Sequence, residues 1–118
     1  MAQRVYQQVI NHGPSVAAAH TYVQKVPFDC QLIHVSACNS TATVITLKIG
    51  NNSDDDCYLL ALNCGVSGTP VEVATPAGFA GVTAGGQFPH LLKGELITLT
   101  FSNAAVANLM VVLTFTEG

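Results

Sequence analysis

The stretch LLKGELITLTFSNAAVANLMVVLTFTEG, residues 91–118, decides the fold class of this 118-residue chain. It contains two runs of alternating apolar residues, separated by the short segment SNAA. Side chains two positions apart lie on the same face of a β-strand, so this alternation indicates strands that each bury one face. The stretch therefore predicts two closing β-strands, at residues 94–101 and 107–118.

The two faces of these strands differ in character. The face that we expect to be buried is fully apolar, with Ile97, Leu99, Phe101, Leu109, Val111, Leu113 and Phe115. The opposite face of the last strand carries Met110 and Val112 with threonines, where a solvated face would carry charged residues. We therefore expect Met110 and Val112 to contact another protein chain.

Apolar residues alternate in the same way, with a period of two residues, through the rest of the sequence. No window supports an amphipathic helix. The run 41–50 places Ile45, Leu47 and Ile49 on its inner face. The run 30–38 places Ile33, Val35 and Ala37 opposite Cys30, Leu32, His34 and Ser36. With turn residues between the runs, the sequence predicts an all-β fold, an antiparallel β-sandwich or jelly roll of about 7–8 strands. Residues 1–118 should form one domain.

Charged residues make up only 9% of the chain, against about 25% in typical soluble domains. This favours a subunit whose faces are covered by partners, although a neutral secreted-type β-domain would have a similar composition. The net charge is −3 and the four Lys and Arg residues are scattered. A nucleic-acid partner is therefore not expected, and without a long apolar segment neither is a membrane.

No catalytic or metal-binding pattern is present, so we expect no enzyme activity, no catalytic residue, no metal and no cofactor. The four histidines lack metal-ligand spacing. Asp54, Asp55 and Asp56 are consecutive, so their side chains should diverge, whereas calcium loops alternate their ligands around a glycine turn. We expect a solvated loop there.

The cysteines and the N-terminus suggest a reducing compartment. MAQRVYQQVI lacks the apolar region of a secretory signal. Cys30, Cys38, Cys57 and Cys64 do not match zinc-site spacing, and we expect small buried or half-buried thiols, with a Cys57–Cys64 or cross-strand disulfide left open. The acceptor pattern Asn39-Ser40-Thr41 then indicates only a turn.

Two further segments are candidates for partner contact. The glycine-rich stretch between Thr75 and Leu92 carries Phe79 and Phe88, which could fill the domain's own core or anchor a partner. Residues 1–15 could form an N-terminal arm, with Arg4 and Tyr6 lying on a neighbouring subunit.

The segments LLKGELITLTFSN…VANLMVVLTFTEG and VPFDCQLIHVSA resemble the strands of small virion-associated β-sandwich proteins, the capsid decoration (cement) proteins of tailed bacteriophages. The resemblance covers about residues 22–38 and 88–118. It implies a jelly-roll structural protein, a homotrimer, that stabilises an icosahedral capsid by binding the major capsid protein where subunits meet. It also implies synthesis in the host cytoplasm and a final location on the virion surface.

Other functions remain open from the sequence alone. One is a carbohydrate- or receptor-binding module of a phage fibre, in which Tyr6, Tyr22 or Tyr58 would stack on a sugar. Others are a small metal-dependent β-barrel enzyme and a major capsid jelly roll, the latter disfavoured by the short chain.

Overall fold

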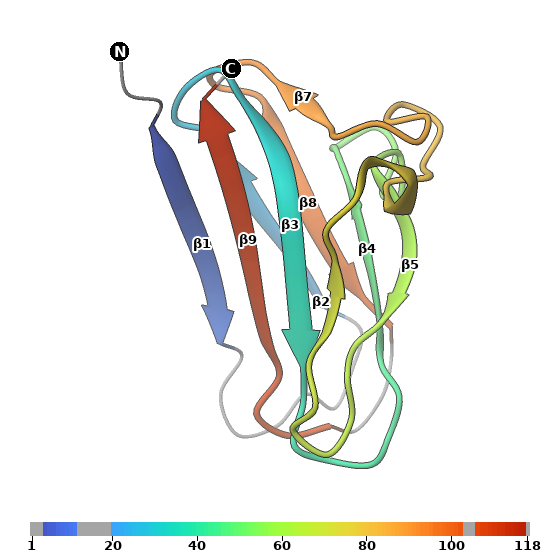
Figure 1. The fold of residues 1–118 in the computed structure, drawn as a ribbon. Coiled ribbons are helices and arrows are strands. Elements are labelled where there is room, and N and C mark those ends of the chain that lie inside the picture. The colour runs from blue at the N-terminus through green and yellow to red at the C-terminus, as the bar shows by residue number, and fades with distance from the viewer. Residues whose placement is uncertain (1–3, 12–19, 103–105, 118) are drawn as a thin grey trace.

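The computed structural model describes residues 4–11, 20–102 and 106–117, which form two antiparallel β-sheets packed face to face (Figure 1). The first sheet has the order β1-β9-β3-β6, with β7 also paired to β3. Its strands are β1 (Val5–Asn11), β9 (Met110–Glu117), β3 (Cys30–Cys38), β6 (Val71–Val73) and β7 (His90–Leu91). The second sheet has the order β2-β8-β4-β5, with β2 (His20–Lys25), β8 (Leu96–Phe101), β4 (Thr46–Gly50) and β5 (Leu59–Asn63).

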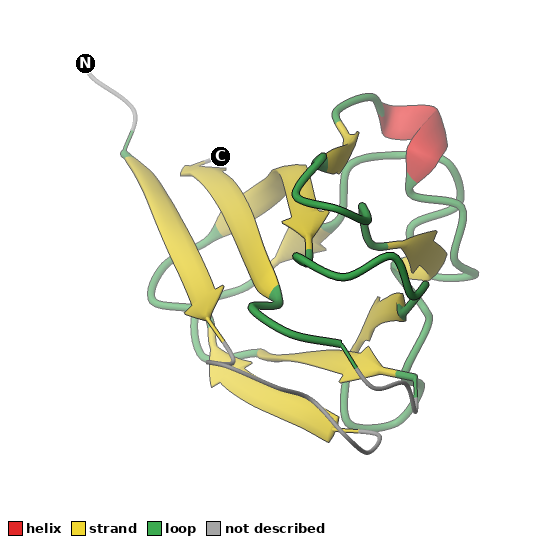
Figure 2. Ribbon diagram, turned by 90° about the horizontal axis from the view of Figure 1, so that it is seen from below, coloured by secondary structure: helices red, strands yellow, loops and turns green. Residues whose placement is uncertain are grey.

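Successive strands cross repeatedly from one sheet to the other. Apart from the β4–β5 hairpin and the short β7, each strand is followed by one in the opposite sheet. With the pairing orders above, this is the jelly-roll arrangement of eight principal strands. The predicted fold class is therefore confirmed, and Figure 2 shows the two layers from below.

Helical structure in the described residues is limited to one short 3-10 turn, Pro76–Gly78. Among those residues, no helix has the length and apolar character needed to cross a membrane.

The core lies between the two sheets and is built as the alternation predicts. The inward residues of β4, β8 and β9 are buried, among them Leu47, Ile49, Ile97, Leu99, Phe101, Val111, Leu113 and Phe115, as is Ile45 just before β4. Met110 and Val112 lie on the opposite face of β9, as predicted.

The prediction for β3 was wrong in phase. Cys30 and Leu32 are buried, but so are Val35 and Ala37, which the alternation had placed on the other face. The pairing of β3 with β9 shifts between Leu32 and His34, so one extra residue, Ile33, is inserted opposite β9. A β-bulge of this kind exchanges the inward and outward positions along the strand.

The glycine-rich stretch between Thr75 and Leu92 contains short secondary-structure elements that the sequence did not predict. It contains the 3-10 turn and β7, whose His90 and Leu91 pair with Gln31 and Cys30 of β3. The two short strands β6 and β7 bring the number of strands to nine, against the seven or eight predicted.

Candidate interaction surface

The outward face of the β1-β9-β3-β6 sheet combines apolar exposure with very little charge. Val5 and Val9 of β1 and Met110 of β9 are 63%, 52% and 39% exposed. Val9 lies directly opposite Val112 in the sheet register. We call Val5, Val9, Met110 and Val112 the apolar patch.

Register places the remaining residues of this face. The pairings put Gln7, Asn11, Gln31, His34, Ser36, Cys38, Glu72, His90, Thr114 and Thr116 on the same side of the sheet. Within the described part of this face, Glu72 is the single acidic residue and there is no Lys or Arg. Its Oε2 lies 2.8 Å from Nε2 of His34. The face therefore offers close contact with little charge to steer or repel a partner.

The outward face of the other sheet is different. It carries Lys25 and Lys48 among threonines, and Val23 is exposed at 56%. Lys48 Nζ lies 4.0 Å from Asp55 Oδ2. With its two lysines, this face is closer to an ordinary solvated sheet surface than is the face that carries the apolar patch.

Arg4 and Tyr6 fasten β1 to the rest of the domain. The Tyr6 ring stacks on Phe115 at 4.7 Å between centroids and meets the edge of Phe28 at 5.5 Å. The Arg4 guanidinium lies 4.1 Å from the centroid of Phe28, and its Nε donates to Glu117 Oε2 at 2.8 Å. Arg4 Nη2 also contacts Glu117 Oε2. The ion pair lowers the pKa of Glu117, chiefly through the side-chain hydrogen bond.

These contacts bear on the predicted arm. Residues 5–11 are a strand of the sandwich, and residues 1–3 and 12–15 of the predicted arm lie outside the described residues. The sequence did not reveal Val5 and Val9, the outward residues of the same strand. The sequence signal for these two residues was the weak alternation of this segment. It identifies them as surface residues beside β9 only when the pairing of β1 with β9 is known.

A shallow pocket of about 460 Å³ lies beside Arg4, at the end of the sandwich near the two termini. Its lining includes the cations Arg4 and Lys93 and the carboxylates Asp29 and Glu117. Asp29 Oδ1 accepts a hydrogen bond from the backbone N of Lys93 at 2.8 Å. Because it is lined by charges of both signs, the pocket does not present a field of one sign to a ligand.

Phe79 and Phe88 lie together on the inner side of the glycine-rich stretch. Phe79 is completely buried, and its ring centroid is 5.9 Å from that of the half-buried Phe88. Phe88 also lines a pocket of about 300 Å³ with Tyr58 and His90. The structure thus places Phe79 in the domain's own core, with Phe88 at its margin.

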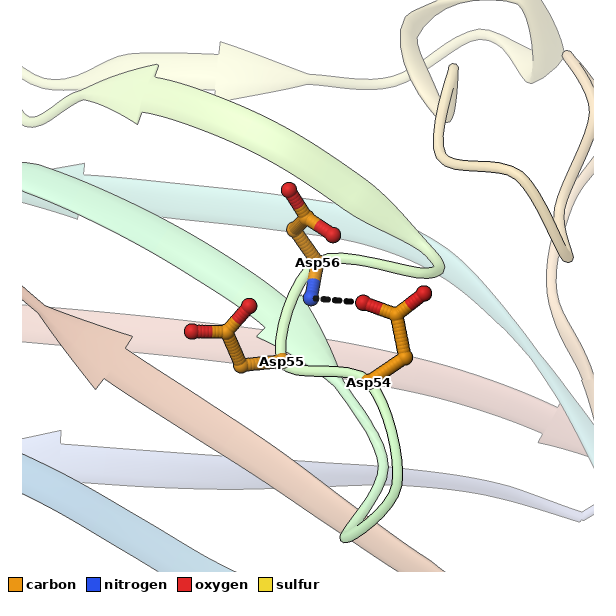
Figure 3. A group of neighbouring side chains, drawn as sticks. All are labelled: Asp54, Asp55 and Asp56. Atoms are coloured by element: carbon orange, nitrogen blue, oxygen red, sulfur yellow. Dashed lines mark hydrogen bonds between the residues drawn. The ribbon is translucent and has the colours of Figure 1, made fainter.

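The three consecutive aspartates lie in the loop between β4 and β5, and their side chains point in different directions (Figure 3). Asp54 Oδ1 accepts a hydrogen bond from the backbone N of Asp56 at 3.3 Å. The pKa of the Asp56 carboxyl is raised, chiefly by a side-chain hydrogen bond with Asp54. One potential ligand atom of each aspartate lies within 4.8 Å of the others, the one such acidic, His or Cys grouping in the described chain.

The described histidine side chains and the thiols do not form a cluster. His34 contacts Glu72 and His90 contacts Gln31. His12 lies outside the described residues. Cys30, Cys57 and Cys64 are buried free thiols and Cys38 is a half-buried one.

No protein-family model matches the sequence, and no curated protein matches it. The fold is similar to that of a chain in the solved cyanophage Pam1 capsid asymmetric unit, with a TM-score of 0.59 and 16% sequence identity. The match covers 98% of this chain and 85% of that chain. At this identity, the likeness establishes a shared fold along nearly the whole chain.

Proposed function

We propose that this protein is a non-enzymatic structural protein of a virion, which decorates an icosahedral phage capsid and stabilises it where capsid subunits meet. The observation that carries the proposal is the fold it shares, over 98% of its length, with a chain of a cyanophage capsid. The decoration role rests on the resemblance of residues 22–38 and 88–118 to cement proteins, together with the nearly uncharged outward face.

In this proposal the apolar patch meets the major capsid protein. Val5, Val9 and Met110 are exposed on a face where a bound protein would meet no Lys or Arg of the described chain. Each such contact is modest, but a homotrimer would repeat it three times. Linked contacts raise retention far above that of a single contact.

The carbohydrate-binding alternative receives no support from the tyrosines. Tyr6 stacks on Phe115, Tyr22 meets the edge of Phe101 at 6.0 Å, and Tyr58 is buried. A sugar-stacking platform needs an exposed ring face, and all three rings pack against the core of the domain.

The proposal is tested by titrating purified protein onto phage heads that were assembled without it. We expect saturable binding at a fixed number of copies per capsid subunit, and heads that open at a higher temperature. Val112→Lys should weaken binding at least tenfold, because a lysine ammonium would be desolvated in the contact. Val23→Lys places the same change on the outward face of the other sheet and should bind normally. Heads that retain no protein at saturation would refute the proposal.

A further inference from the structure

β1 is an open edge of its sheet. It pairs with β9 along its whole length, from Val5 opposite Thr116 to Asn11 opposite Met110. In the described structure no strand pairs with its other side, and Figures 1 and 2 show β1 as the outermost strand of its layer. An unpaired edge presents a row of backbone N–H and C=O groups, which an extended strand of another chain can satisfy.

The other three sheet edges carry features that discourage such pairing. β6 has three residues, and one is Glu72. β2 ends at the exposed Lys25, and β5 has five residues with a register shift against β4. β1 has seven residues in regular register, without a charged residue, a proline or a bulge. Natural proteins rarely leave such an edge uncovered.

One hydrogen bond fixes which backbone groups of β1 point outward. The backbone N of Glu117 donates to the carbonyl O of Arg4 at 2.8 Å, so the backbone groups of Arg4 face β9. In an antiparallel ladder this direction alternates from residue to residue. The N–H and C=O groups of Val5, Gln7 and Val9 therefore face away from β9, toward the open side.

We propose that two copies of this chain pair through β1, antiparallel, about a two-fold axis at Gln8. In this register Gln7 of each copy lies opposite Val9 of the other, and these two outward residues exchange both of their backbone hydrogen bonds. Gln8 faces its own counterpart as a non-hydrogen-bonded pair. Centring the pairing on Gln7 or Val9 would shorten the overlap by two residues, so the Gln8 register uses the edge most fully.

Several features favour a second copy as the occupant. A two-fold contact places a strand against a second copy of itself, so any charged residue near the axis would meet a residue of the same charge. β1 has no charged residue, so this repulsion does not arise. On the outward face, Gln7 of the second copy covers Val9, and the two apolar patches become parts of one continuous sheet surface. The contact does not rest on the proposed capsid role. It joins copies two by two, so a trimer built elsewhere on the surface would become a hexamer.

The first test is light scattering of the purified protein at several concentrations. We expect a mass that is an even multiple of 12.3 kDa, and half that mass for Val9→Pro. Proline removes an outward N–H and leaves the bonds to β9 in place. Val9→Thr keeps the N–H and should keep the wild-type mass. A wild-type monomer or trimer, or a folded Val9→Pro of unchanged mass, would overturn the proposal.

A second test does not depend on how the proline variant folds. In a Cys38→Ser background, Gln8→Cys should form a disulfide-linked dimer on mild oxidation, because a non-hydrogen-bonded pair has Cα atoms about 4.5 Å apart. Asn11→Cys is the control, since six residues of offset place it about 20 Å from its counterpart. Equal cross-linking of the two variants, or none in Gln8→Cys, would contradict the two-fold pairing. Neither test involves a capsid, so its failure would leave the proposed function standing.

Discussion

At the scale of single residues, Asn39 shows how a buried polar side chain can tie loops to the sandwich. Its Nδ2 donates to the carbonyl oxygens of Gly65 and Thr43, at 3.1 and 3.3 Å. Its Oδ1 accepts from the backbone N and the hydroxyl of Thr41, at 2.8 and 2.6 Å. With 1% of its surface exposed, Asn39 satisfies its own hydrogen-bonding groups and joins the end of β3 to two loops.

Asn39→Asp should therefore lower the free energy of unfolding by about 3 kcal/mol at pH 7. The carboxylate cannot donate, so it would be buried against two carbonyl oxygens. Urea denaturation measures the change. Asn63→Asp, an exposed position on β5, should change stability by less than about 0.5 kcal/mol. Similar losses at both positions would mean that burial of Asn39 is not what matters.

The Arg4–Glu117 pair gives a second prediction at this scale. Arg4 holds the pKa of Glu117 below its ordinary value of 4.5. Because the folded-state pKa is the lower one, the pair's contribution to stability is present above the unfolded-state pKa and is lost as pH falls through the folded-state value. NMR titration of the Glu117 carboxyl carbon should give a depressed midpoint, and Arg4→Gln should raise it. The same midpoint in both proteins would show that the pair does not persist in solution.

At the scale of elements, the turn Leu92–Glu95 explains the Lys-Gly-Glu pattern that precedes β8. Gly94 has a φ of 87°, the left-handed region in which a residue with Cβ is strained. The backbone N of Glu95 donates to Leu92 O, and Glu95 Oε1 accepts from the backbone N of Leu92, both at 2.9 Å. Gly94 N also donates to Val26 O at 2.8 Å, which fixes this turn against the segment after β2.

Gly94→Ala should lower the free energy of unfolding by about 1 kcal/mol, because alanine pays for the left-handed conformation that glycine adopts freely. A Cβ at this position would have open space, so the loss is one of backbone strain and not of a clash. Lys93→Ala, at the preceding turn position, is the control and should be close to neutral. Urea denaturation of the three proteins checks the difference, and an unchanged Gly94→Ala would contradict the turn conformation.

The sequence could predict those strands whose pattern of apolar residues is local. β4, β8 and β9 alternate strictly, so their buried faces could be predicted. In β3, apolar residues stand at both odd and even positions around Ile33. The alternation therefore gives no sign of the bulge. β6 and β7 are too short to show a period and are strands because they bond to β3.

The same limit applies to the interaction surface. Met110 and Val112 could be predicted as outward residues of β9 because the alternation there is local. That Val9 lies opposite Val112, with Val5 further along the same face, depends on pairing between residues more than a hundred positions apart. The open edge of β1 is likewise a property of the sheet order, which no short window of the sequence contains.

At the scale of the whole molecule, the thiols report whether the chain unfolds as one unit. Burial raises the pKa of Cys30 to about 11 and that of Cys64 to about 12, and it also raises the pKa of Cys57. These thiols would stay protonated at pH 8, and only the thiolate reacts rapidly with a disulfide reagent. Cys30 begins β3, whereas Cys57 and Cys64 flank β5 in the other sheet, so the three sample both layers of the core.

With an aromatic disulfide reagent at pH 8, we therefore expect one fast thiol, the half-buried Cys38, and three slow ones. If residues 4–117 form a single cooperative domain, the three slow thiols should react at one common rate, because each becomes accessible only on global unfolding. Urea should accelerate all three with the same dependence on its concentration. Cys38→Ser should remove the fast phase and leave the slow phase unchanged. Separate slow rates would show instead that the two sheets open independently.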